Sequence, residues 1–203
     1  TLVVWGATAE KNVPLPEQKT VDVPFSSQAP VGDWSEPWAS ACEETSIYMV
    51  SSFYTEDEIA REEAVKKIRE IFDTKTSEIQ VSRDESLETI IEIIKKLELP
   101  FTPKIVLDPT VDDLKRELVE NRPIIVPVYA PLLNNPYYDG VEYHVLVLIG
   151  YDDAEGMFIV NDPGTRHGEG LKFSYDVFLN AIHDLNHENY ATGEKAVLFT
   201  ESK

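Results

Sequence analysis

The stretch YHVLVLIGYDDAEGMFIVND, residues 143–162, decides the fold prediction. It contains two apolar runs, 143–153 and 156–162, that meet at the short turn DDAEG. Apolar and β-branched runs on either side of a tight turn are typical of two antiparallel strands. Similar runs predict further strands at 124–130, 170–174 and 195–200. We therefore expect one antiparallel sheet in this half of the chain.

Helical periodicity dominates the chain before this sheet. Apolar residues recur at helical spacing from Cys42 onward, and amphipathic stretches follow at 56–72, 85–99 and 111–121. A further helix is predicted at 174–186. Helices that mostly precede an antiparallel sheet indicate the α+β class rather than alternating α/β.

The length sets the domain prediction. A chain of 203 residues is one large domain or two small ones. We expect residues 1–20 to be a lead-in or linker and residues 21–203 to form a single domain.

The composition is strongly acidic, with 37 Asp plus Glu against 18 Lys plus Arg and a formal net charge of −19. Such a surface repels phosphate backbones and anionic lipids, so we expect no nucleic-acid partner. Neutral or basic substrates are favoured by the same field. No apolar run reaches the ~18 residues that a membrane span needs, so none is expected in this chain. Composition leaves the oligomeric state open.

The single cysteine, Cys42, lies in the stretch SACEETSIYM, residues 40–49. Ser40 and Glu43 have the spacing of a capping box, which would place Cys42 in the first helical turn. The positive end of a helix favours a thiolate and lowers the pKa of a cysteine there. The alternative interpretation is a buried structural cysteine, and position alone gives the two about equal weight.

A base and its partner are predicted on the hairpin. His144 begins the apolar strand, and pairing across the turn would bring it near Asp162 or Asn161. An acceptor on the far ring nitrogen is what a Cys–His pair needs to fix the tautomer. Gln28, in the proline-containing loop 25–41, could donate to an oxyanion together with the Cys42 backbone N–H.

Three segments together resemble a known family. VPFSSQAPVGDWSEPWASACEETS (23–46), YHVLVLIGY (143–151) and VNDPGT (160–165) resemble the papain-like cysteine peptidases. The resemblance is closest to the bacterial peptidase-like branch related to the double-glycine leader, bacteriocin-processing peptidases, and it covers roughly residues 21–200. It implies a papain-like cysteine proteinase fold, with an N-terminal helical half packed on a C-terminal antiparallel sheet.

The resemblance also implies residue roles. Cys42 would be the nucleophile, His144 the general base, Asp162 the orienting residue with Asn161 as the alternative, and Gln28 the oxyanion donor. The chemistry implied is hydrolysis of amide bonds in a peptide or protein substrate, through a covalent thioester and without a cofactor. The same triad could instead transfer the acyl group to an amine.

The residue after the cysteine departs from the family pattern and favours a non-catalytic alternative. Glu43 stands where members often have Gly or another small residue, and a neighbouring carboxylate disfavours a thiolate. A non-catalytic papain-like module that binds peptide is therefore the second hypothesis. For either, the resemblance implies an extracytoplasmic or cell-surface location in a bacterium. Because the chain starts at Thr1, we expect a processed or truncated form whose targeting segment is absent.

Further candidates surround these motifs. Trp34, Tyr138 and Arg166 are predicted to bind substrate, because the loops that carry them flank the proposed site. His183 and His187 have the i, i+4 spacing of a zinc helix, with Asp184 between them and His167 as a possible third ligand. We expect instead a helix C-terminus that favours cationic side chains, and no metal.

Overall fold

The computed structural model describes residues 14–80 and 84–203. In these ranges seven strands form one sheet in the order β2-β7-β3-β4-β5-β6, and β1 also pairs with β4. Every pairing is antiparallel. The strands are β1 Gln18–Thr20, β2 Phe101–Leu107, β3 Ile124–Tyr129, β4 Tyr143–Asp152, β5 Met157–Asn161, β6 Leu171–Ser174 and β7 Ala196–Ser202.

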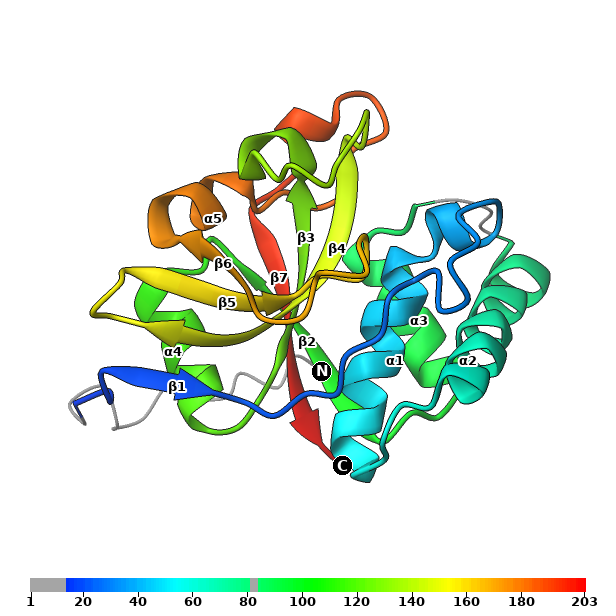
Figure 1. Cartoon of the computed structure of the whole chain (residues 1–203), viewed down its shortest axis with the longest axis horizontal. Coiled ribbons are helices and arrows are strands. Elements are labelled where there is room, and N and C mark those ends of the chain that lie inside the picture. Colours follow the sequence, from blue (N-terminus) through cyan, green and yellow to red (C-terminus); the bar gives the residue numbers. More distant parts are fainter. Residues whose placement is uncertain (1–13, 81–83) are drawn as a thin grey trace, which may run out of the picture.

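The helices lie on two sides of this sheet. Figure 1 shows α1, α2 and α3 together on one side, with α4 and α5 near the opposite end of the molecule. Their bounds are α1 Cys42–Thr55, α2 Arg61–Thr74, α3 Leu87–Lys96, α4 Val111–Val119 and α5 Tyr175–Ala181. A π-helical turn, Lys75–Ile79, continues α2, and short 3-10 turns cover Trp38–Ser40, Ala130–Leu133 and Tyr190–Thr192. The α+β class and the papain-like arrangement predicted from the sequence are confirmed.

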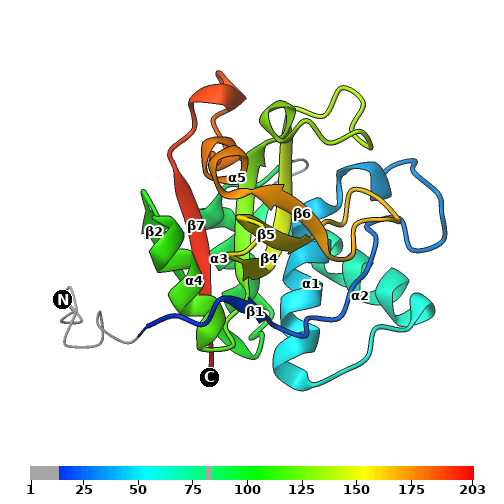
Figure 2. The same cartoon turned by 60° about the vertical axis from the view of Figure 1, so that its left-hand side comes forward.

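The first turns of α1 are held against β4. Ile47 and Val50 of α1 are fully buried, as are Val145 and Val147 of β4, and each such side chain contributes about 1.5–3 kcal/mol on burial. The Ser46 hydroxyl donates to the carbonyl oxygen of Val145 at 3.2 Å. In Figure 2 strands β2 and β7 lie at the left of the sheet, and α1 and α2 lie to the right of β4, β5 and β6. This packing brings the start of α1 to the start of β4.

Several elements differ from the prediction, among them α2, which begins at Arg61 and not at 56. Strand β2 was missed, because Pro103 interrupts its apolar run; a proline is tolerated there since β2 is an edge strand. Helix α5 ends at Ala181 rather than 186, because the next residue, Ile182, forms a β-bridge with Val128. Residues 18–20 of the predicted lead-in form β1, and residues 1–13 lie outside the described ranges.

None of the helices in the described ranges combines the length and apolar character that crossing a bilayer requires.

Candidate active site

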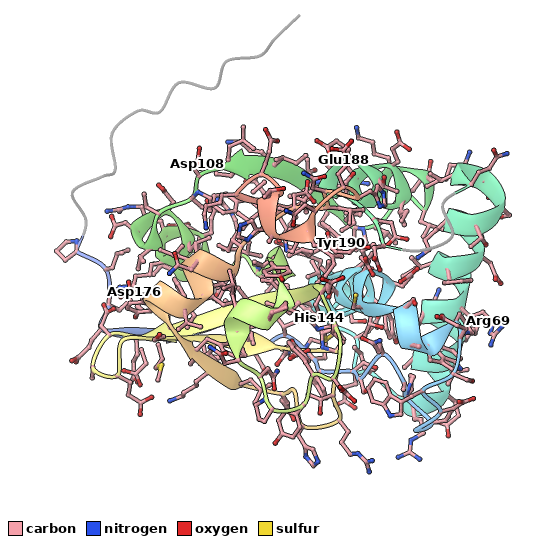
Figure 3. The ribbon with its side chains drawn as sticks, turned by 90° about the horizontal axis from the view of Figure 1, so that it is seen from above. Arg69, Asp108, His144, Asp176, Glu188 and Tyr190 are labelled. Atoms are coloured by element: carbon pink, nitrogen blue, oxygen red, sulfur yellow. The ribbon has the colours of Figure 1, made fainter. Side chains whose placement is uncertain are left out.

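The starts of α1 and β4 meet at a cavity of about 560 Å³. Cys42, His144 and Gln28 all line it, and Figure 3, in which His144 is labelled, views this part of the molecule from above. The sulfur of Cys42 accepts a hydrogen bond from the backbone N–H of Val145, the residue after His144. The predicted nucleophile and the predicted base therefore share one wall of the cavity.

His144 and Asp162 form a buried pair. The ring Nε2 lies 2.7 Å from Asp162 Oδ1, and the two residues are 3% and 0% exposed. Burial acts to raise the pKa of Asp162, but the His144 charge and several hydrogen bonds outweigh it, so that the pKa is lowered. Asp162 is thus held as a carboxylate. Because Nε2 faces this carboxylate, Nδ1 is the ring nitrogen left to exchange a proton with the thiol.

Further groups fix Asp162 in place. Its Oδ2 accepts from Asn135 Nδ2 at 3.1 Å and from the Tyr138 hydroxyl at 2.7 Å, and its Oδ1 accepts from the Gly164 backbone N–H at 2.9 Å. The Tyr138 ring also packs edge-on against the His144 ring, with centroids 5.1 Å apart. Asn135 and Tyr138 therefore hold in place the carboxylate that contacts the His144 ring.

A comparison with protein families identifies the chain. The sequence profile of the Peptidase_C39 like family matches residues 20–192. The chain belongs to the Peptidase_C39 like family. It is thus a cysteine peptidase of the C39 branch of the papain-like fold, as the sequence motifs predicted.

Solved structures agree on the fold. A C39-like peptidase from Bacillus anthracis has a TM-score of 0.60 and 14% identity, over 93% of this chain and 100% of that chain. Xylellain, a cysteine protease from Xylella fastidiosa, has a TM-score of 0.56 and 15% identity, over 98% of this chain and 91% of that one. No curated protein matches the chain by sequence.

In this C39-like peptidase Asp162, not Asn161, contacts the His144 ring. Asn161 is fully buried, and its amide donates to the Val23 carbonyl oxygen at 2.9 Å and accepts from the Gly170 N–H at 3.3 Å. Neighbouring residues of an extended chain point to opposite faces, so only one of the pair can face His144. Asn161 instead ties the N-terminal segment to the strand.

Gln28 lies at the cavity but is engaged elsewhere. Its side-chain Nε2 donates to the carbonyl oxygens of Trp38 at 2.9 Å and Ala39 at 3.0 Å. Its backbone N–H donates to the Pro163 carbonyl oxygen at 2.9 Å. The amide would have to exchange one of these bonds to donate to an oxyanion, so its catalytic role stays a prediction.

The predicted capping box is wrong. Helix α1 has Ala41 as its N-cap without a side-chain cap bond, and the Ser40 hydroxyl donates to Glu36 Oε1 at 2.9 Å. Glu43 turns inward, where its Oε2 accepts from the Cys42 thiol at 2.9 Å and its Oε1 accepts from the Glu85 N–H at 3.1 Å. Buried partners distant in sequence thus outcompete the local cap.

The expected lowering of the Cys42 pKa is wrong for the same reason. Burial raises the pKa of the thiol well above its usual value, and the charge and hydrogen bond of Glu43 raise it further. The bond from the Val145 N–H opposes this without reversing it. Burial and Glu43 therefore both favour the neutral thiol of Cys42 over the thiolate.

The predicted substrate-binding residues divide into two groups. Trp34, 40% exposed, and Tyr138 line the cavity, although the Tyr138 hydroxyl is used by Asp162. Arg166 is exposed and is not among the residues that line this cavity. Asn135 was missed by sequence analysis, since a single loop amide carries no pattern; the only signal was the aromatic-rich stretch NNPYY (134–138) that contains it.

The histidine pair does not form the helical motif. His183 and His187 both follow the end of α5, so neither lies on a helix face; His183 comes directly after the C-cap residue Ile182, at the helix C-terminus that the alternative predicted. His183 contacts the Ala181 carbonyl oxygen through Nδ1 at 3.2 Å, and Asp184 accepts from the Leu87 N–H at 3.1 Å. His167, the suggested third ligand, packs beside Tyr137. The bond between Asp184 and the Leu87 N–H connects the segment after α5 to the start of α3.

Gly164 has no side chain, and this leaves the space that the His144 ring occupies. A Cβ at residue 164 would lie 2.8 Å from His144 Cε1 and 3.2 Å from Asp162 Oδ1. We expect Gly164→Ala to displace the ring and to lower kcat/KM by about 100-fold, since a shift of 1 Å has effects of that order. Gly140→Ala is the control for backbone strain. Residue 140 has a positive φ, so alanine is strained there, but its added Cβ would meet no atom within 4 Å. Steady-state kinetics with unchanged activity in Gly164→Ala would contradict this placement.

Stability is expected to depend on pH through Glu44. Burial raises its pKa from 4.5 to about 7, with Lys75 opposing and Glu43 adding to the shift. An acid with a higher pKa in the folded state stabilises the fold below its unfolded pKa and loses this contribution as pH rises through the folded value. We expect wild type to lose about 1–3 kcal/mol from this group between pH 5 and pH 8. Glu44→Gln should lack that loss in urea unfolding; an identical pH slope in both proteins would refute the assignment.

Proposed function

We propose that this C39-like chain hydrolyses peptide bonds with Cys42 as nucleophile, His144 as general base and Asp162 as orienting acid. The observation that carries the proposal is the buried bond between His144 Nε2 and Asp162 Oδ1, 2.7 Å long, beside the cavity that Cys42 also lines. A carboxylate on the far ring nitrogen holds the tautomer whose Nδ1 accepts a proton. The same pair at a distance from the thiol would support only a structural role.

The reaction would proceed by acyl transfer. The thiol proton passes to His144 Nδ1 while sulfur bonds to the substrate carbonyl carbon, and the carbonyl electron pair moves to oxygen. Backbone N–H groups in the first turn of α1 have no partner within the helix and can donate to this oxyanion. The imidazolium then returns the proton to the leaving amine. Water, deprotonated by His144, hydrolyses the thioester and frees Cys42.

The cavity favours neutral or basic peptides. Trp34, Tyr137 and Tyr190 offer aromatic walls, and Asp84, Asp139 and Glu142 contribute carboxylates. Together with the net charge of −19, these acids disfavour an anionic substrate at the site. An extracytoplasmic or cell-surface location in a bacterium, where peptides of this kind are accessible, remains part of the proposal.

A peptide library tests the proposal. Wild type and Cys42→Ala are incubated with peptides of varied sequence, and products are identified by mass spectrometry. We expect cleavage by wild type and a loss of at least about 1000-fold in Cys42→Ala, the residual rate coming from binding alone. Equal cleavage by both proteins would show that the thiol is not the nucleophile. A product joined to an added amine would reveal acyl transfer by the same triad.

A peptide-binding module is the second candidate. The observation that favours it is the hydrogen bond from the Cys42 thiol to Glu43, because it keeps the sulfur protonated. Binding of the same peptide by wild type and Cys42→Ala, with cleavage by neither, would select this alternative. Isothermal titration with library peptides measures it.

A further inference from the structure

A buried carboxylate contacts the nucleophile but has no part in the mechanism above. Glu43 is fully buried, its Oε2 accepts from Cys42 Sγ at 2.9 Å, and its Oε1 accepts from the Glu85 backbone N–H at 3.1 Å. Each carboxylate oxygen is therefore fixed by one donor. The side chain is built to hold an acceptor beside the sulfur.

A buried network surrounds this carboxylate. Carboxylate oxygens of Glu43, Glu44 and Glu85 all lie within 4.8 Å of one another, and the Lys75 ammonium contacts both Glu44 and Glu85. Burial and the neighbouring carboxylates raise the pKa of Glu85 to about 11, so it keeps its proton at neutral pH. The cluster thus includes its own cation and one neutral acid, and Glu43 remains available to the thiol.

The thiol has one proton, and two acceptors compete for it. While Cys42 donates to Glu43, that proton is not shared with His144. Catalysis requires the opposite, since the S–H bond must break and its proton must reach Nδ1. A carboxylate at 2.9 Å stabilises the protonated sulfur by hydrogen bonding and destabilises the thiolate by charge repulsion.

We propose that Glu43 is a positioning residue that holds resting Cys42 as a neutral thiol, so that the thiolate forms only as the proton passes to His144 during reaction. This inference rests on the proposed nucleophilic role of Cys42. A neutral thiol reacts slowly with alkylating agents and peroxide, because the thiolate is the reactive form. Glu43 would therefore protect the site between turnovers.

Charged and titratable groups face this pair from each neighbouring element in the described ranges. They are Glu44 on α1, Lys75 on the π-helical turn, Glu85 before α3, Tyr143 and His144 on β4, and Tyr138 in the loop before β4. In the described ranges the Cys42 sulfur donates its hydrogen bond to Glu43 and to none of these neighbouring groups. Replacing Glu43 should therefore change the thiol far more than replacing its neighbours.

Glu43→Gln tests the inference with little change in shape. If Gln Oε1 keeps the Glu85 N–H, its Nε2 faces the sulfur and donates to a thiolate instead of accepting from a thiol. We expect the pH midpoint of iodoacetamide alkylation to fall by about 1–3 units and the rate at pH 7 to rise at least about tenfold. Because Cys42 is the single cysteine, intact-mass spectrometry counts this reaction directly.

Glu44→Gln is the matched control, since it removes an equally buried carboxylate that does not bond to the sulfur. Its midpoint should shift by less than about half a unit. Unchanged or slower alkylation in a Glu43→Gln protein with native circular dichroism would overturn the inference; slower reaction would make Glu43 a base. If Glu43→Gln does not fold, the wild-type profile can still overturn the inference: a midpoint at or below about 8.5 in the folded protein, the value of an ordinary cysteine, would contradict it.

These outcomes are separate from those of the peptidase assay. Alkylation needs no substrate, so a wild-type protein that cleaves no peptide can still confirm or contradict the role of Glu43. Failure of cleavage, together with a midpoint that falls in Glu43→Gln and not in Glu44→Gln, would leave the role of Glu43 confirmed and the hydrolase function refuted.

Discussion

His144→Ala is expected to lower kcat/KM by about 100- to 10,000-fold, the range that a general base contributes. The expected cause is loss of the acceptor for the thiol proton, because His144 lies at the cavity with Nε2 held by Asp162 at 2.7 Å. Steady-state kinetics with a cleaved library peptide measures the effect. His187→Ala, an exposed histidine after α5, should keep wild-type activity.

Asp162→Asn extends the same prediction. The amide fills the same space, but it can either donate to His144 or accept from it, so it no longer fixes one tautomer of the ring. It also removes the negative charge that stabilises the imidazolium. We expect a large loss of kcat together with a lower melting temperature, because the new amide nitrogen cannot accept the hydrogen bonds that the Asp162 oxygens accept from Asn135, Tyr138 and Gly164. Full activity of His144→Ala or Asp162→Asn would show that the pair is structural.

Lys75→Met is expected to cause the largest loss of stability, about 3–5 kcal/mol. Lys75 is fully buried and its ammonium contacts Glu44 and Glu85, which are also buried. Removing the Lys75 ammonium leaves the Glu44 carboxylate without its buried cation or forces it to bind a proton. The melting temperature should fall by roughly 10 °C or more for a chain of this size.

The size of that loss should depend on pH. At pH 5 the carboxylates can bind protons, so the Lys75→Met protein should recover part of the lost stability relative to pH 8. Lys67→Met is the control, because Lys67 pairs with Glu70 at an exposed site, 3.1 Å apart, where pairs contribute less than ~1 kcal/mol. Equal melting temperatures for Lys75→Met and Lys67→Met would contradict the buried network.

The hairpin and its pair of residues were predictable from sequence. Strand periodicity and the DDAEG turn set the pairing of β4 with β5, and the structure gives this pairing with Val147 opposite Asn161. The predicted contact of His144 with Asp162 is present, but Asn161 lies opposite Val147, three residues along β4 from His144, so the two side chains meet diagonally and not as direct cross-strand partners. The choice between Asn161 and Asp162 was not predictable, because it depends on which neighbour turns towards His144.

The surroundings of Cys42 were not predictable in the same way. The Ser40–Glu43 spacing is a local signal, but the partners that draw Glu43 inward include Glu85, 42 residues away in the chain. No pattern in the sequence says that three acids and a lysine will be buried together. Tertiary burial therefore overrode the helix-cap motif and reversed the expected direction of the thiol pKa.

The measurement that tests the central claim most directly is labelling by a peptidyl acyloxymethyl ketone, which alkylates an active-site cysteine after binding as a peptide does. Wild type and His144→Ala are treated alike, digested and mapped by mass spectrometry. The account predicts a thioether on Cys42 in wild type, formed at least about tenfold more slowly in His144→Ala, with equal labelling once both proteins are unfolded. Equal rates in the two folded proteins, or a folded wild type whose Cys42 stays unlabelled, would contradict it.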